Sequence, residues 1–211
     1  MLNWLARIGW SHGDQEVFSR DQIRELFELE KVHRSAAQAD SNKLAWLNQH
    51  WIKSLPRPEL LAALLPFLAA EAGRATVETT PELERLVELL RERSKTLVEM
   101  AQLARFLVSD RIVYQDKAAQ KHLTKASEPL LVDLHERLAA LADWSEAGLE
   151  RVFEDIRARH GDLPMGKLAQ PARVAVTGGA VSPPIFETLA VLGKPRAVGR
   201  IAEAIHYLRH G

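Results

Sequence analysis

The sequence predicts an all-α protein, built as a multi-helix bundle. In most of its 211 residues apolar side chains recur every three or four positions, which is typical of one face of an amphipathic helix. Several of these segments begin with a Ser, Thr or Asp at the position that caps a helix. Strand-like patterns are scarce, and the best examples are residues 111–114 (RIVY) and 173–176 (RVAV).

The N-terminal quarter is predicted to hold three helices. Residues 2–8 (LNWLARI) have helical apolar spacing that stops at Gly9. Ser19 and Gln22 form a capping-box pattern, so a second helix is expected to begin there and to include residues 23–30. Asp40 is placed to cap a third helix, which ends before Pro56.

The middle of the chain is predicted to hold two long helical runs. Residues 59–73 (ELLAALLPFLAAEAG) are almost wholly apolar up to Glu71, which favours a helix deep in a bundle, kinked or restarted at Pro66. Thr80 followed by Pro81 is a cap with proline at the first helical position, and it opens one amphipathic run to about residue 110. A turn with a short extended piece is expected over residues 109–117.

Further helices are expected in the C-terminal part. One spans residues 123–142, and Asp143 with Glu146 forms a second capping-box pattern ahead of the next, over residues 148–161. Residues 170–189 (QPARVAVTGGAVSPPIFETL) then interrupt the pattern with a Gly-Gly pair and two prolines. Ser182 and Pro183 again pair a cap with proline before two last helices, over residues 185–193 and 195–210.

Composition bounds the class of protein. The chain is 46% hydrophobic and 27% charged, as in soluble globular domains, and its length suits one large domain or two to three small ones. It has no cysteine, which excludes disulfides and thiolate zinc sites and favours a cytoplasmic location. No apolar run approaches the roughly 20 residues that span a bilayer, and residues 1–10 do not resemble a signal peptide.

Motifs of a self-contained active site are absent from the sequence. The eight histidines are scattered without an HExxH pair, and there is no P-loop, no GxGxxG and no GxSxG. Most carboxylates have the spacing of solvated helix faces. We therefore predict no catalytic residue, no metal and no cofactor within these 211 residues.

The distribution of charge indicates a polyanionic partner. The formal net charge is zero, yet residues 151–211 carry nine Lys and Arg against five Asp and Glu. Among the tryptophans, Trp4, Trp51 and Trp144 are expected in the core. Trp46 lies off the apolar face of its helix, so core packing and stacking on a base both remain open for it.

Three groups of residues resemble bacterial glutamyl-tRNA synthetases. Residues 2–19 with 40–52 resemble the region after that family's nucleotide-binding half, and residues 89–107 (LLRERSKTLVEMAQLARFL) look like its middle helical segment. Residues 166–194 (GKLAQPARVAVTGGAVSPPIFETLAVLGK) are similar to its C-terminal signature. The HIGH-type and KMSKS-type motifs of this class I family are missing. The resemblance therefore implies a C-terminal portion, excised or natural, without the domain that uses ATP and Mg²⁺ to activate glutamate.

The resemblance also implies a domain organisation. Residues 1–57 would form a stem-contact region, for which Lys43, Trp46 and Asn48 are the candidate tRNA contacts. Residues 58–126 and 127–211 would form two helical sub-bundles of an α-helical anticodon-binding domain. The implied partner is tRNA(Glu), bound by a monomer, with no DNA and no membrane involved. The competing hypothesis is a helical adaptor that binds a protein through residues 59–70.

The resemblance further implies which residues contact the anticodon. They are Arg173, the arginine of the family's QPxR motif, together with Ser182, Pro183 and Ile185. A second arginine, of residues 91–96 (RERSKT), would contact base 36; we predict Arg93, with Arg91 as the alternative in another register.

Elementary chemistry agrees with this assignment. Cytosine offers acceptors at O2 and N3 that suit an arginine donor fork, and a turn-rich loop exposes backbone groups that a regular helix does not.

Overall fold

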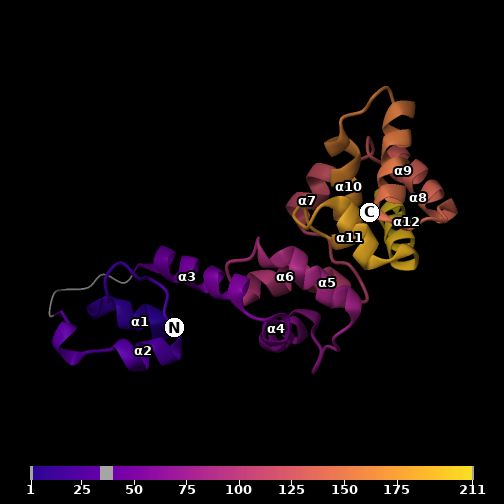
Figure 1. Cartoon of the computed structure of the whole chain (residues 1–211). Coiled ribbons are helices and arrows are strands. Elements are labelled where there is room, and N and C mark those ends of the chain that lie inside the picture. The colour runs from indigo at the N-terminus through magenta and orange to yellow at the C-terminus, as the bar shows by residue number, and fades with distance from the viewer. Residues whose placement is uncertain (1, 34–39, 211) are drawn as a thin grey trace.

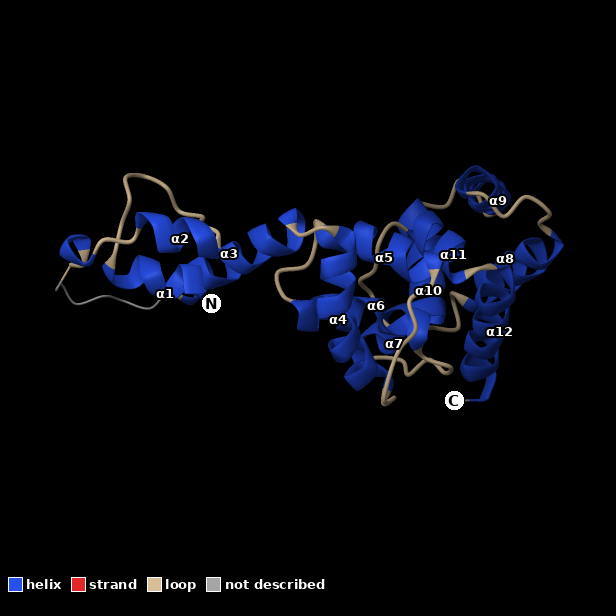
Figure 2. Cartoon of the chain, turned by 60° about the horizontal axis from the view of Figure 1, so that its bottom comes forward, coloured by secondary structure: helices blue, strands red, loops and turns tan. Residues whose placement is uncertain are grey.

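The structure, a computed structural model, describes residues 2–33 and 40–210 and is all-α, as predicted (Figures 1 and 2). Within these residues the only β-type pairing is an isolated bridge between Trp10 and Val32. The N-terminal helices are α1 (Leu2–Gly9), α2 (Arg20–Leu26), the short 3-10 helix η1 (Leu29–Lys31) and α3 (Ser41–Ser54). They are followed by α4 (Arg57–Ala72), α5 (Pro81–Arg91), α6 (Leu97–Val108) and α7 (Asp116–His122). The last five are α8 (Glu128–Ala140), α9 (Glu146–Arg159), α10 (Met165–Thr177), α11 (Ile185–Leu192) and α12 (Lys194–His210).

The molecule is elongated, with α1 and α2 at one end (Figure 1). Helix α3 leads from them to the group formed by α4, α5 and α6, and helices α7 to α12 make up the far end (Figures 1 and 2). None of the described helices is both long and apolar enough to cross a membrane.

Two separate groups of buried side chains hold the chain together. A small one, of Trp10, Phe18 and Ile23, lies among α1, α2 and the loop between them. The large one is continuous from Ile52 to Ile205, so the core does not break at the predicted boundary after residue 126. In this large core α4 packs mainly against α6, and each buried leucine stabilises the fold by about 1.5–3 kcal/mol.

Three of the predicted helix caps are confirmed. Ser19 and Gln22 form the reciprocal capping box of α2. The Asp40 carboxylate accepts from the Asn42 N–H at 2.8 Å, and the Thr80 hydroxyl accepts from the Leu83 N–H. Each cap satisfies a backbone donor that the first turn of a helix leaves without a partner.

Two predicted caps are wrong. Helix α9 is capped by Ser145 rather than Asp143, since the Ser145 hydroxyl accepts from the Gly148 N–H at 3.1 Å. The Asp143 carboxylate instead binds Arg151. Helix α11 begins at Ile185, so its N-cap position is Pro184, which has no side-chain acceptor, and the buried Ser182 lies two residues before that position.

The long amphipathic run predicted from Thr80 to residue 110 is two helices. It breaks at residues 92–96, between α5 and α6. Thr96 caps α6 by accepting from the Glu99 N–H at 3.0 Å, and the buried Ser94 hydroxyl bonds back to the Leu90 carbonyl. Ser and Thr compete with helical backbone bonds in this way, whereas Pro66 is accommodated inside an unbroken α4.

Both strand-like patterns have another structure. Residues 173–176 belong to α10, where apolar residues are buried on several faces and no helical stripe stands out. Residues 111–114 are non-helical, but they pair with no strand among the described residues. Trp144 packs against the core as predicted and donates to the Leu189 carbonyl, while Trp4 and Trp51 are half-buried.

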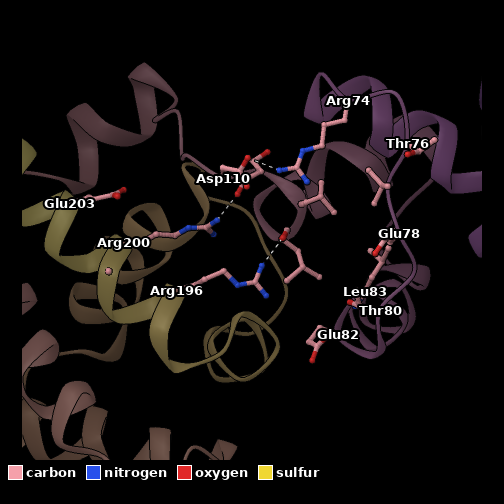
Figure 3. Close-up of a pocket in the computed structure, with 15 residues that line it drawn as sticks. Arg74, Thr76, Glu78, Thr80, Glu82, Leu83, Asp110, Arg196, Arg200 and Glu203 are labelled. Carbon is pink, nitrogen blue, oxygen red and sulfur yellow. Dashed lines mark hydrogen bonds and ion pairs between the residues drawn. The ribbon is translucent and has the colours of Figure 1, made fainter.

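Two arginines of α12 link this helix to the C-terminal ends of α6 and α10 (Figure 3). Arg200, only 5% exposed, donates to the Val176 carbonyl at the end of α10 and to the Ser109 carbonyl at the end of α6, both at 2.9 Å. Arg196, which is exposed, donates to the Leu107 carbonyl at 2.8 Å. Helix C-termini leave carbonyls unsatisfied, and a cation suits the negative end of the helix dipole.

Burial should determine how much each of these two arginines contributes to the free energy of unfolding. Arg200→Met is expected to lower the free energy of unfolding by about 2–3 kcal/mol, because buried carbonyls lose a charged donor. Arg196→Met should cost under about 1 kcal/mol, because water replaces its bonds. Urea unfolding followed by circular dichroism measures both. Equal losses would contradict the assigned role of Arg200.

Candidate nucleic-acid interface

The interruption in residues 170–189 is a tight turn that depends on one glycine. Helix α10 ends at Gly178, whose φ of +80° lies in the left-handed region. A Cβ there would stand 2.4 Å from the Val113 carbonyl oxygen, and the Gln115 N–H donates to the Gly178 carbonyl at 2.8 Å. Only glycine fits both the backbone conformation and the close approach of residues 113–115.

Arg173 lies on the last turns of α10 and binds the loop that follows. Its Nη1 donates to the Pro183 carbonyl at 2.6 Å, to the Ser182 carbonyl at 3.2 Å and to the Ser182 hydroxyl. Within the described residues, the hydrogen bonds of this guanidinium all leave from Nη1. The side chain is half-buried. Arg173 therefore fixes the loop with one nitrogen and keeps Nε and Nη2 for another partner.

The loop residues expected to contact a base are buried in this structure. Ser182 and Ile185 are 7% and 5% exposed, and Pro183 is buried as well. The Ser182 hydroxyl lies 3.0 Å from that of Thr188, a buried pair that satisfies both polar groups. At the surface the loop instead presents Val181, which is 70% exposed, and Pro184.

The break between α5 and α6 brings a second arginine to the same region. Burial lowers the pKa of Arg173 below its ordinary value, and the charge of Arg93 lowers it further. Arg93 therefore lies within electrostatic reach of Arg173, although the two belong to distant segments of the chain. Its side chain is exposed, and it is absent from the ion pairs found in the described residues.

Arg91, the alternative to Arg93, is held by contacts within the protein. Its guanidinium donates to the Leu55 carbonyl at the end of α3, at 3.1 Å, and pairs with Glu88 at 3.3 Å. Its side chain is only 18% exposed. Of the two arginines that the sequence left open, Arg93 is the one available to a partner.

The turn at Gly178 and Gly179 is called the glycine turn below. A hollow of about 190 Å³ lies between α6 and this glycine turn. Sequence reasoning missed it, because its polar residues look like ordinary solvated helix and loop positions. The residues that line it are Glu99, Gln102, Leu103, Arg105, Phe106, Gln115, Thr177, Gly179 and Val181. The amides and the guanidinium offer both donors and acceptors for the edge of a base.

The three candidate stem contacts differ in whether their side chains already bind other residues of the protein. Lys43 forms an ion pair with Glu16 at 2.7 Å, and this contact holds the pKa of the Glu16 carboxyl below its ordinary value. Asn48 donates to the Lys95 carbonyl, which ties α3 to the α5–α6 connection. Trp46 is 48% exposed beside His50, so it is the candidate that presents an open surface.

No group of three or more potential metal ligands occurs among the described residues. Another hollow, of about 670 Å³, lies beside α12 (Figure 3). It is lined by arginines and by acidic residues alike, and Arg196 and Arg200 already bind carbonyl groups there. The region of Arg173 and Arg93 is therefore the stronger candidate for binding a polyanion.

Comparison with known proteins identifies the family of most of the chain. Residues 59–205 match the family described as "Anticodon binding domain". The chain belongs to this anticodon-binding domain family.

Its relatives include glutamate–tRNA ligases of Geobacter sulfurreducens and Legionella pneumophila, 44% and 42% identical over 99% of the chain. In structure it is similar to a glutamate tRNA ligase from Elizabethkingia meningosepticum, with a TM-score of 0.80 and 25% identity over 98% of the chain. These matches confirm the resemblance to glutamyl-tRNA synthetases. The chain spans 44% of the length of the two ligases and 40% of the solved chain.

The close approach of the backbone at Gly178 can be tested through stability. Gly178→Ala should lower the free energy of unfolding by about 3 kcal/mol, since it adds a clash with Val113 to the cost of a positive φ. Gly161→Ala is the matched control, with a φ of +74° and no atom within 4 Å of the new Cβ, and should cost about 1 kcal/mol. Thermal unfolding measures both, and equal losses would show that the close approach is unimportant.

Proposed function

We propose that this chain is the tRNA-recognition part of a glutamate–tRNA ligase and binds the anticodon of tRNA(Glu). The observation that supports it best is the match to the anticodon-binding domain over residues 59–205. The arrangement of Arg93 and Arg173 adds to it, since tertiary structure brings two arginines from distant segments within electrostatic reach of each other.

In this proposal the two arginines read base edges. Glutamate codons require C at position 36, U at position 35 and U or C at position 34 of the anticodon. Arg93 is assigned to base 36, because its guanidinium is exposed and can offer its donor fork to O2 and N3 of cytosine. Arg173 contributes the nitrogens that the loop does not use, and the hollow beside α6 receives an unstacked base.

The buried loop residues have a supporting role in this proposal. Direct contact by the side chains of Ser182, Pro183 and Ile185 would require them to leave the core. We therefore assign them to holding the loop in shape, while Val181 and Pro184 touch the RNA. Trp46 is the proposed stacking surface of the stem-contact region, with Lys43 and Asn48 beside it.

We place the ATP- and Mg²⁺-dependent joining of glutamate to tRNA outside these 211 residues, because motifs for nucleotide binding are absent from them. The relatives named glutamate–tRNA ligases are more than twice as long. We propose a cytoplasmic, monomeric tRNA-binding unit.

The adaptor hypothesis loses most of the leucine face on which it depended. The leucines of residues 59–70 that suggested a docking face, Leu60, Leu61, Leu64 and Leu68, are buried in the large core. Phe67, 39% exposed, is the largest apolar side chain that this segment presents.

Arg93→Gln should weaken binding of tRNA(Glu) by about 1–3 kcal/mol, the scale of one bidentate base contact. Fluorescence anisotropy with labelled tRNA measures the affinity. On a tRNA with base 36 changed, the same substitution should cost little. Arg91→Gln is the control and should leave affinity unchanged while lowering stability by about 1 kcal/mol, through removal of its hydrogen bond to Leu55. Equal effects of the two variants on affinity would contradict the assignment.

Arg173→Ala should also weaken binding of tRNA(Glu), by about 1–3 kcal/mol, with a smaller loss on an anticodon-swapped tRNA. Because Arg173 also supports the loop, Arg173→Lys separates its two roles. Lysine retains a donor for the Ser182 and Pro183 carbonyls but lacks the planar fork. Full affinity in Arg173→Lys would mean that the residue acts on the loop alone.

A further inference from the structure

A second hollow, of about 580 Å³, lies at the opposite end of α7 from the glycine turn. We will call it the basic hollow. It is lined by Lys121, His122, Thr124, Ala126, Ser127, Leu130, Leu163, Pro164, Gly166, Lys167 and Pro171. Three of these side chains are basic, and no carboxylate is among them.

The basic side chains are not committed to ion pairs. Lys121 and Lys167 are exposed, and neither belongs to the ion pairs formed among the described residues. Two acidic residues are adjacent in sequence to the lining: Glu128, beside Ser127, binds Arg209 at 2.7 Å, and Asp162, beside Leu163, is exposed to solvent. Burial and the charge of Lys121 hold the pKa of His122 below its ordinary value, so at neutral pH the two lysines supply the positive charge.

Between the basic side chains the lining is largely apolar, but the backbone at Gly166 is open to a ligand. A Cβ at Gly166, in the first turn of α10, would meet no atom within 4 Å, so a ligand can approach the chain closely there. Helix α10 has no acidic residue in its first turn. Thr124 adds a hydroxyl to the lining, whereas the buried Ser127 hydroxyl accepts from the Thr124 N–H and donates to the Thr124 carbonyl.

Helix α7 fixes the distance between the basic hollow and the proposed anticodon site. It begins where Gln115 binds Gly178 and ends at His122. Its seven residues span about 10 Å at 1.5 Å each. Both ends of α7 therefore lie within reach of one RNA strand a few nucleotides long.

We propose that the basic hollow binds backbone phosphate groups of the same RNA, with Lys121 and Lys167 as the cationic contacts. This inference rests on the proposed function and adds a second, sequence-independent contact to it. Phosphate contacts position a nucleic acid, whereas base contacts specify it. The basic hollow thus holds the strand in register while the glycine turn and the two arginines read the bases.

The alternative role for these residues is a structural one. Lys121 and His122 lie in the last turn of α7, where cations stabilise the negative end of a helix. That role concerns stability and would not involve Lys167, which belongs to α10. A binding measurement with both lysines replaced separates the two.

The test is the salt dependence of tRNA(Glu) binding to the 211-residue chain. In Lys121→Gln/Lys167→Gln, the slope of log K against log salt should fall in magnitude by about 0.7 for each phosphate that is no longer neutralised, thus by about 1.4. The loss of affinity should be the same for the cognate and the anticodon-swapped tRNA. Lys121→Arg/Lys167→Arg should retain the wild-type slope, and circular dichroism verifies that each variant is folded.

The matched control removes two positive charges elsewhere. Arg85 and Arg151 are exposed residues that pair with Glu146 and Asp143, outside the basic hollow. Arg85→Gln/Arg151→Gln should leave the slope unchanged. If the slope changed equally in the control and in the lysine variant, the effect would come from net charge alone, and the proposal would be overturned.

The outcomes separate this inference from the proposed function. If wild-type protein binds tRNA(Glu) but the lysine variant keeps its slope, the basic hollow is not a phosphate site. If wild-type protein binds no tRNA(Glu), the proposed function itself fails. Binding of anionic phospholipid vesicles in preference to tRNA, abolished in the lysine variant, would overturn the assignment to RNA.

Discussion

The close contact between the Gly178 turn and residues 113–115 is the constraint on which the rest of the interface depends. It is a backbone contact, made by the Gln115 N–H and the Gly178 carbonyl and permitted by the absence of a Cβ. The contact starts α7 beside the end of α10. It therefore sets the position of the loop that Arg173 binds, the hollow beside α6 and the direction of α7 toward the basic hollow.

Arginines have several different roles in this fold, and burial separates them. Arg200 is buried against the ends of α6 and α10, where its charge serves two carbonyls. Arg91 similarly holds the end of α3. Arg93 is exposed and Arg173 is half-buried, with part of its guanidinium uncommitted. A charge held by the protein's own carbonyls contributes to stability, whereas one facing water is available to a polyanion.

The interface combines features that a regular helix bundle lacks. Helices satisfy their own backbone groups, so recognition of RNA falls to turns, side chains and cavities between helices. Here the turn at Gly178, the break at residues 92–96 and the hollow beside α6 all lie along one set of packed helices. The large continuous core beneath them keeps these parts in fixed relation.

The sequence by itself determined the helical class and several helix starts. These depend on periodicity and on capping side chains a few residues away, as at Ser19 and Thr80. The resemblance to a known family supplied Arg173 and the choice between Arg91 and Arg93. Only the tertiary structure ties Arg91 to the Leu55 carbonyl while leaving Arg93 exposed, turns Ser182 inward against Thr188 and brings Lys121 and Lys167 to one hollow. Each of these outcomes depends on a neighbour from another segment, and a local pattern carries no information about which segment will pack against it.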